Sequence, residues 1–287
     1  MWFEESLQNL LAQLGLEQQQ FPDIILWAVP VMLSLVLIEF ILTRKKGIFN
    51  YQRKDFWASV GIGIGNLIVS AIIKTSVLFL IVFLYKITPW KIANEYFWWS
   101  LIPCIIASDF ARYWAHRIAH ESRFLWATHV THHSSVNYTF AVSFRLSWVQ
   151  HIKLVFFVPI MLMGFHPIIF IITNQIEVLY QFWIHTELIR KLPKPIEYIF
   201  TTPSHHRVHH AKNDKYIDKN YGSTFIFWDR MFGTFQSEEE RPDYGIKKPV
   251  EGYNPVWLVF HEWVDITKDT FKTKGFKNKM KVMFGRP

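Results

Sequence analysis

The sequence predicts an all-α integral membrane protein with four to five transmembrane helices and a cytosolic, histidine-rich helical cap. Three observations lead to this prediction. Hydrophobic residues make up 51% of the 287 positions, and they gather into runs close to the roughly 20 residues that a helix needs to cross a bilayer. Basic residues cluster beside these runs. Nine of the 13 histidines, eight of them in three groups and one single residue, His185, lie near the ends of the later runs.

The membrane-spanning helices are predicted from four apolar runs. The fourth is long enough for two spans that turn near Gly164–Pro167. Before the first run, residues 1–22 predict a short amphipathic helix on the membrane surface. The runs cover residues 24–42, 56–85, 97–115 and 152–183.

Residues 23–96 form an N-terminal transmembrane region with little polar chemistry. Its three glycines Gly61, Gly63 and Gly65 resemble a nucleotide-binding loop only superficially. Inside an apolar run they indicate close helix packing instead.

Charge predicts the orientation. Short basic loops stay on the cytoplasmic side of a membrane. The connection after the first run carries Arg44, Lys45, Lys46, Arg53 and Lys54, and residues 237–287 form a basic tail that we expect in the cytosol. Counting spans from these two segments places every histidine group on the cytosolic face. The expected location is a bacterial inner membrane, or the endoplasmic reticulum of a eukaryote.

Composition also excludes several classes of function. The formal charge of +8 could suggest nucleic-acid binding, but the basic residues lie next to the membrane and no nucleic-acid motif is present. Attraction to anionic lipid headgroups is the simpler explanation. The single cysteine, Cys104, rules out an intrachain disulfide, a cysteine-based zinc site and a cysteine-ligated iron–sulfur cluster.

The predicted catalytic core covers residues 97–236 and contains three histidine motifs. His116 and His120 are four apart on a predicted helix, so both lie on one face and can bind one metal. The other two motifs share the pattern HxxHH, in which the adjacent rings diverge by about 100° around a helix axis and can serve two metals. These motifs are His129–His132–His133 and His206–His209–His210.

Three further residues complete the predicted site. His185 ends a polar helix face and is expected to be a ligand. Asp109 lies two turns before His116, and an acidic residue at membrane depth indicates a functional site. We expect Asp109 to accept an N–H from a ligand histidine, with an ion pair to Arg112 as the alternative. Glu121 is either a ligand, a group that supports the ligands, or a solvated carboxylate.

Other polar residues have weaker assignments. Glu177 and Asn174 are candidates for the lining of a substrate channel. His205 is a candidate ligand or supporting group. The remaining histidines stand apart and are expected to be structural or interfacial: His151, His166 and His261.

The number of imidazoles bears on the metal. A catalytic zinc site normally needs three protein ligands and an open position. Nine imidazoles fit two metals with four or five ligands each. Imidazole alone does not select iron over zinc, so a pair of iron ions that activates oxygen and a di-zinc hydrolase both remain open at this point. A histidine-lined transporter would place its ligands near the bilayer midplane, which the predicted position at one face disfavours.

These motifs resemble the histidine boxes of the fatty acid hydroxylase/sterol desaturase superfamily of membrane di-iron enzymes, and are most similar to its alkylglycerol monooxygenase-like bacterial branch. The boxes are HRIAHE (116–121), LWATHVTHHSS (125–135) and HHRVHH (205–210). The resemblance implies that the nine histidines of the three motifs and His185 bind two iron ions, with Glu121 in support. It further implies hydroxylation of a lipid C–H bond by O2.

Two matters are left open by the resemblance. A desaturase would use the same site and the same first step, so it is the alternative activity. The sequence has no flavin, haem or iron–sulfur motif, so electrons are expected from an external donor, either tetrahydrobiopterin or an electron-transfer protein. The expected partners are therefore a lipid substrate, the membrane and this donor, and no nucleic acid.

Overall fold

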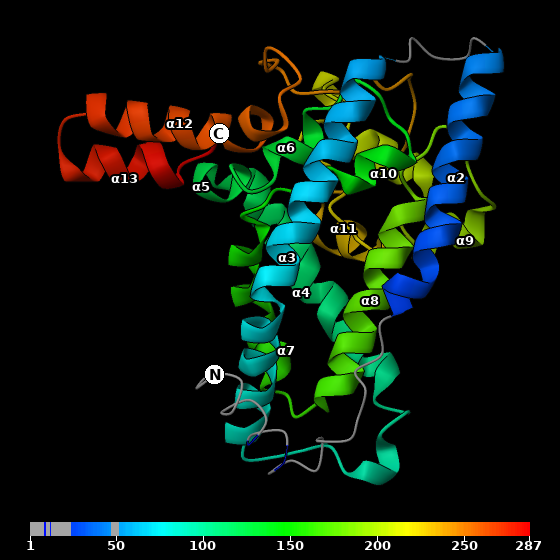
Figure 1. The fold of residues 1–287 in the computed structure, drawn as a ribbon, viewed down its shortest axis with the longest axis vertical. Coiled ribbons are helices and arrows are strands. Elements are labelled where there is room, and N and C mark those ends of the chain that lie inside the picture. Colours follow the sequence, from blue (N-terminus) through cyan, green and yellow to red (C-terminus); the bar gives the residue numbers. More distant parts are fainter. Residues whose placement is uncertain (1–8, 10–11, 13–23, 47–51) are drawn as a thin grey trace.

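The computed structural model describes residues 9, 12, 24–46 and 52–287, and all regular elements among them are helices (Figure 1). The predicted all-α fold is confirmed for this part of the chain. The predicted amphipathic segment 1–22, apart from residues 9 and 12, and residues 47–51 of the basic connection after the first run lie outside the described residues.

Two helices are long and apolar enough to cross a membrane, α2 (Ile24–Lys46) and α3 (Arg53–Ile87). Helix α3 has 35 residues and is therefore about 52 Å long. It extends along most of the height of the molecule (Figure 1). These helices are candidates for the first two predicted spans. The further spans remain a prediction.

The predicted hairpin in the fourth apolar run is present as two helical arms joined by a turn. Its first arm is η3 (Gln150–Phe157) continued by α7 (Val158–Met161), and its second arm is α8 (Pro167–Trp183). Gly164 makes the turn with a φ of +85°, where a Cβ would lie 2.7 Å from the carbonyl oxygen of Trp90.

Helix α4 (Leu101–Glu121) packs against both arms of this hairpin, and buried residues of α3 belong to the same apolar core. The apolar core between these helices contains Leu84, Cys104, Phe157 and Ile169, all buried. This core leaves the last turns of α4, which carry His116 and His120, pointing into the cap.

The glycines of α3 allow close packing, as predicted. A Cβ on Gly61 would lie 2.8 Å from a ring carbon of Pro255, and one on Gly65 would lie 2.2 Å from the Trp148 indole. The Trp148 indole N–H donates to the Ile62 carbonyl at 2.9 Å. Glycine is therefore required on this face because another segment lies directly against the α3 backbone.

The cap surrounds the histidines with short helices and loops, which hold their side chains by tertiary contacts rather than by helix length. Its helices are α5 (Arg123–Trp126), α6 (Val130–His133), η2 (Phe140–Phe144), α9 (Lys194–Ile199), α10 (Pro203–His209), η4 (Asp214–Tyr216) and α11 (Phe227–Phe232). A further short helix, η1 (Asn94–Tyr96), precedes α4.

The two long helices contribute buried acids to the cap, although little polar chemistry is expected of residues 23–96. Glu39 of α2 accepts the backbone N–H of Phe140 at 2.6 Å and a short hydrogen bond from the Thr186 hydroxyl. Asp55 of α3 pairs with Arg145 at 2.8 Å, and both side chains are almost fully buried. An acidic residue inside an apolar run was the available sequence signal for Glu39.

The C-terminal region is more ordered than the predicted tail. After an irregular segment, α12 (Pro255–Lys272) and α13 (Phe276–Phe284) form an antiparallel hairpin beside α3 and α5. This hairpin projects sideways from the long axis of α3 (Figure 1).

Candidate metal centre

The structure brings all nine candidate ligands together in two groups. Within each group, one ligand atom from each residue lies within 4.8 Å of all the others. We call them the five-histidine group and the four-histidine group. The first comprises His116, His120, His129, His133 and His209, and the second comprises His132, His185, His206 and His210.

The spacing of the motifs explains this division. His116 and His120 lie on one face of α4 and enter the same group, as predicted. In α6 the adjacent residues His132 and His133 separate into different groups, because neighbouring side chains diverge around a helix. His209 and His210 at the end of α10 separate in the same way. The two groups are therefore neighbours, and the rings of His133 and His210 stack with centroids 4.4 Å apart.

Backbone carbonyls fix the orientation of three rings. The Nδ1 nitrogens of His116, His209 and His185 lie 2.8, 2.9 and 2.6 Å from the carbonyl oxygens of Tyr221, Lys219 and Gln181. A carbonyl can only accept, so in each ring Nδ1 carries the proton. A neutral imidazole has one N–H, and Nε2 is left with a bare lone pair.

The free nitrogens converge with the spacing of a coordination shell. His185 Nε2 lies 2.9 Å from His206 Nε2 and 3.1 Å from His132 Nε2, and His209 Nε2 lies 3.1 Å from His133 Nε2. Two nitrogens bound at about 2.1 Å and at right angles are separated by about 3.0 Å. The buried Nε2 atoms of His116 and His120 have no hydrogen-bond partner. These features fit a cation within each group.

Burial keeps the cap histidines neutral, which is the form that binds metal. Loss of hydration, followed by the proximity of other imidazoles, lowers the pKa of His133 and of His210 well below its usual value. Burial likewise lowers the pKa of His185 to about 4. At neutral pH these rings therefore offer lone pairs and no positive charge.

Asp109 does not make the contacts that were predicted for it. Its carboxylate accepts the backbone N–H groups of Thr224 and Phe225 at 2.7 and 3.2 Å and the indole N–H of Trp228 at 2.9 Å. Among the described residues, no histidine donates to Asp109 and no ion pair joins it to Arg112. Its contacts anchor the start of α11 on α4 instead of orienting a ligand directly.

Glu121 lies outside both groups. It forms ion pairs with Arg117 at 3.2 Å and with Arg286 at 3.7 Å, and its side chain is partly exposed. These contacts match the solvated-carboxylate alternative. Glu177, a candidate for a channel lining, forms a 2.7 Å ion pair with Arg112, which also donates to Asn174.

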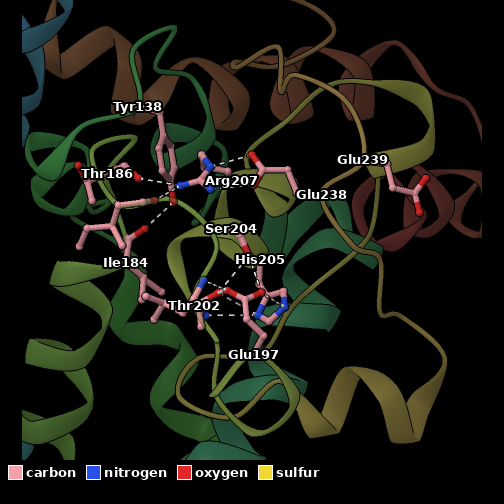
Figure 2. Close-up of polar contacts among 12 residues, drawn as sticks. Tyr138, Ile184, Thr186, Glu197, Thr202, Ser204, His205, Arg207, Glu238 and Glu239 are labelled. Carbon is pink, nitrogen blue, oxygen red and sulfur yellow. Dashed lines mark hydrogen bonds and ion pairs between the residues drawn. The ribbon is translucent and has the colours of Figure 1, made fainter. Parts of the chain in front are cut away.

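His205 is fully engaged in a separate network (Figure 2). Its Nδ1 accepts the backbone N–H of Thr202 at 3.3 Å, and its Nε2 lies 3.1 Å from a carboxylate oxygen of Glu197. Burial would raise the pKa of Glu197, but hydrogen bonds led by that from His205, with others from the Leu192 N–H and from Ser204, lower it to about 2. Both nitrogens of His205 are occupied, so it supports the start of α10 and offers no lone pair to a metal.

Sequence reasoning missed the residues that position these ligands. Arg207 binds Glu238 through two hydrogen bonds of 2.7 Å, and it donates to the carbonyl oxygens of Thr186 and Ile189. Figure 2 shows how it ties α10 to the loop that carries His185. The partners are distant in sequence, so no local pattern could have identified them.

A second missed residue is Asp229, which is fully buried in α11. It accepts the backbone N–H groups of Tyr221 and Gly222 at 2.8 and 2.7 Å. The Tyr221 carbonyl in turn accepts from His116. Asp229 therefore fixes the loop that sets the orientation of a candidate ligand.

The histidines assigned no metal role are all placed outside the two groups. His166 caps the start of α8, and His261 lies on α12. His151 lies in η3.

The two groups open into a cavity of about 1040 Å³ on the side of the C-terminal hairpin. His120, His133, His209 and His210 line its inner end. Trp126 lies there too, with its ring centroid 4.9 Å from that of His120. Trp257, His261 and Lys281 line the part formed by α12 and α13. A small or chain-like molecule could therefore reach both groups from one opening.

Comparison with known proteins shows what this chain is similar to. Residues 101–234 match the fatty acid hydroxylase family. The chain is 36% identical over 282 residues to alkylglycerol monooxygenase of Homo sapiens, a match that covers 94% of this chain and 60% of that protein. It is 43% identical over 200 residues to alkylglycerol monooxygenase of Xenopus tropicalis, covering 69% of this chain and 43% of that protein.

A bacterial relative is ornithine lipid hydroxylase OlsE of Rhizobium tropici, 28% identical over 135 residues, or 46% of this chain and 40% of that protein. The chain thus spans less than two thirds of the length of these relatives. No solved structure matches it.

Proposed function

We propose that this chain, whose residues 101–234 match the fatty acid hydroxylase family, is a membrane-bound non-haem di-iron oxygenase. It would hydroxylate an alkyl C–H bond of a lipid with O2 and two external electrons. The reaction balances as RH + O2 + 2e⁻ + 2H⁺ → ROH + H2O. The observation that carries the proposal is the convergence of nine histidines into two adjacent groups.

The residues of the two groups fit two iron ions. The five-histidine group would hold one ion and the four-histidine group the other. Both donor sets are neutral imidazoles, which suit iron. When bound, two adjacent ions supply the redox chemistry that reduces O2 and oxidises an alkyl chain.

The side chains around the ligands contribute positioning. Carbonyl acceptors on Tyr221, Lys219 and Gln181 hold three imidazoles in the tautomer that presents Nε2. Such outer contacts set ring orientation and raise ligand basicity. Arg207 and Asp229 hold the segments from which the ligands project. The cavity beside His120 and His210 would receive the reacting part of the lipid.

Hydroxylation is preferred to the alternatives because of the relatives' activities. The relatives named above are monooxygenases or a hydroxylase of lipids. A desaturase would use the same site and remove a second hydrogen. A di-zinc hydrolase would use the same imidazoles and take its oxygen from water.

The electron donor and the topology belong to the same proposal. Electrons would come from tetrahydrobiopterin or from an electron-transfer protein. The apolar runs favour four to five spans, and the basic residues beside them favour a histidine cap in the cytosol. The membrane would be a bacterial inner membrane or the endoplasmic reticulum.

The test is isotope incorporation with the full chain in its membrane. Membranes that contain the protein are incubated with reductant under 18O2, and their lipids are analysed by mass spectrometry. A lipid that gains one 18O atom supports the proposal, and the matched variant His132→Ala should not form it. A product that loses two hydrogens would indicate a desaturase. Oxygen taken from H2 18O, with turnover in the absence of air, would indicate a hydrolase and overturn the proposal.

A further inference from the structure

The C-terminal hairpin of α12 and α13 carries an apolar stripe that is exposed at both of its ends. Val256, Phe260, Val264 and Phe271 follow one another along α12 at helical spacing. Phe271 is 81% exposed, and Phe276 at the start of α13 is 79% exposed. Large aromatic side chains this exposed at the tip of a folded hairpin indicate a contact with another apolar phase.

The opposite face of α12 is already occupied. Leu258, Val259 and Ile266 are buried, and Leu258 and Val259 form a cluster with Ile62 of α3. Glu262 and Asp269 both form ion pairs with Arg123, at 2.7 and 2.8 Å. The hairpin is therefore held firmly on the cap. The apolar stripe is exposed on a well-anchored helix, so a loose helix is not the reason for its exposure.

The hairpin is also strongly basic. Residues 255–287 contain seven basic and three acidic residues, a net charge of +4, and no acidic residue follows Asp269. In the described part of the chain, no ion pair forms at any of the six lysines of the hairpin: Lys268, Lys272, Lys274, Lys277, Lys279 and Lys281. Exposed aromatics next to unpaired lysines are typical of helices that lie in a membrane interface.

The stripe is continuous with the surface of a membrane-spanning candidate. The Phe260 ring lies 5.9 Å from the Trp148 ring, and Trp148 lies against Gly65 of α3. Nearby, Ile64 and Leu67 of α3 are 55% and 71% exposed. An apolar surface thus runs from α3 across Trp148 onto α12.

We propose that the α12–α13 hairpin lies in the headgroup region of the same bilayer that α3 crosses. Acyl chains would contact the stripe from Val256 to Phe271, and the lysines would bind anionic headgroups. A second copy of the chain is a less suitable partner, because face-to-face hairpins would bring two sets of unpaired lysines together without countercharge.

This placement has a consequence for the cavity. Trp257, His261 and Lys281 of the hairpin line it, and its inner end is formed by candidate ligands. A hairpin seated on the bilayer would bring the hairpin side of the cavity close to the lipid headgroups. The α12–α13 hairpin would then both contact the membrane and line the route to the metal centre.

The test measures the depth of two neighbouring residues in the full-length protein. A nitroxide is attached to Phe271→Cys or to Lys272→Cys, both in a Cys104→Ser background, since Cys104 is the only natural cysteine. The two positions are adjacent, both are exposed, and they point about 100° apart around α12. Each protein is reconstituted into nanodiscs of phosphatidylcholine and phosphatidylglycerol. Power-saturation electron paramagnetic resonance then measures how accessible the nitroxide is to O2, which enters lipid, and to a water-soluble nickel chelate. The accessibility to O2 divided by that to the chelate reports the depth of the label.

We expect this ratio to be several-fold higher at position 271 than at position 272, and to fall at 271 when phosphatidylglycerol is omitted. Equal ratios at both positions would overturn the proposal. Low accessibility of position 271 to both reagents, with spin–spin broadening that disappears on dilution with unlabelled protein, would also overturn it and identify a second copy as the partner. A ratio independent of phosphatidylglycerol would contradict the role of the lysines. None of these readouts depends on catalysis, so they are separate from the test of the hydroxylase.

Discussion

Replacing Asp55 by asparagine should loosen the cap from the membrane helices. Asp55 pairs with Arg145 at 2.8 Å, and the exposed fractions of their side chains are 3% and 1%. The Asp55 carboxylate also accepts a hydrogen bond from Ser135. Removing one partner of a buried pair leaves the other charge uncompensated, at a cost of about 3–5 kcal/mol.

Arg145 also links this pair to the ligands. It donates to the carbonyl oxygen of Thr131 at 3.0 Å and to the hydroxyl of Ser134 at 2.9 Å. Thr131 lies in α6, between His129 and His132. We therefore expect Asp55→Asn to lower metal retention as well as stability.

The assay is the apparent melting temperature of the metal-loaded protein in detergent, at one fixed scan rate because unfolding of such proteins is often irreversible. With about 2–4 °C for each kcal/mol in a chain of this size, the expected decrease is roughly 6–20 °C. The matched control is Lys54→Gln at the neighbouring exposed position, which should change the melting temperature by less than about 2 °C.

A double-mutant cycle separates the interaction energy of the ion pair from nonspecific destabilisation by either substitution. Arg145→Met should destabilise by a similar amount, and the double variant Asp55→Asn/Arg145→Met should lose clearly less than the sum of the two. Strictly additive losses, or an Asp55→Asn protein as stable as the control, would refute the argument that this pair holds α6 on α3.

The metal centre and its supports give three further predictions. His206→Ala leaves three imidazoles in the four-histidine group, so metal analysis of anaerobically purified protein should find about one ion per chain, while unchanged content would contradict the grouping. Burial lowers the pKa of His185 to about 4, below its value of about 6.5 in an unfolded chain. Between these two pKa values the unfolded chain binds more protons than the folded one. The melting temperature of metal-free protein should therefore fall as pH is lowered from about 6.5 to about 4. A melting temperature that does not change with pH would count against a neutral buried ring. Arg207→Gln removes the two hydrogen bonds to Glu238, and stopped-flow measurements with a chelator should show metal release faster by about ten-fold, whereas wild-type rates would show that Arg207 is not needed to hold α10.

The way in which the histidines of each motif divide between the two groups was predictable, because histidine spacing is a local property. Residues three and four apart lie on one helix face, and adjacent residues diverge. Those two rules anticipate how His132 and His133 separate between the two groups. They require no knowledge of how distant segments meet.

The surroundings of the ligands could not be predicted, because they depend on contacts between distant segments. Asp109 lies on the predicted stripe of α4, yet its partners begin at Thr224, more than 100 residues later. The sequence could indicate that Asp109 is unusual but not which groups it binds. The same holds for Arg207 and Glu238. The basic tail was expected in the cytosol because of its charge. The spacing of Phe260, Val264 and Phe271, which indicates an amphipathic helix, was not used.

The length of α3 makes the thickness of the bilayer relevant to the cap. The helix is about 52 Å long, against about 30 Å for the hydrocarbon core of a typical membrane. Its first turns must therefore rise above the lipid, and these are the turns that carry Asp55. A helix adapts to a thinner or thicker membrane by tilting. Because Asp55 is paired with Arg145, we expect tilting of α3 to move α6 with it, so that sterol content or acyl-chain length would alter the spacing of His129 and His133 from His116 and His120 on α4.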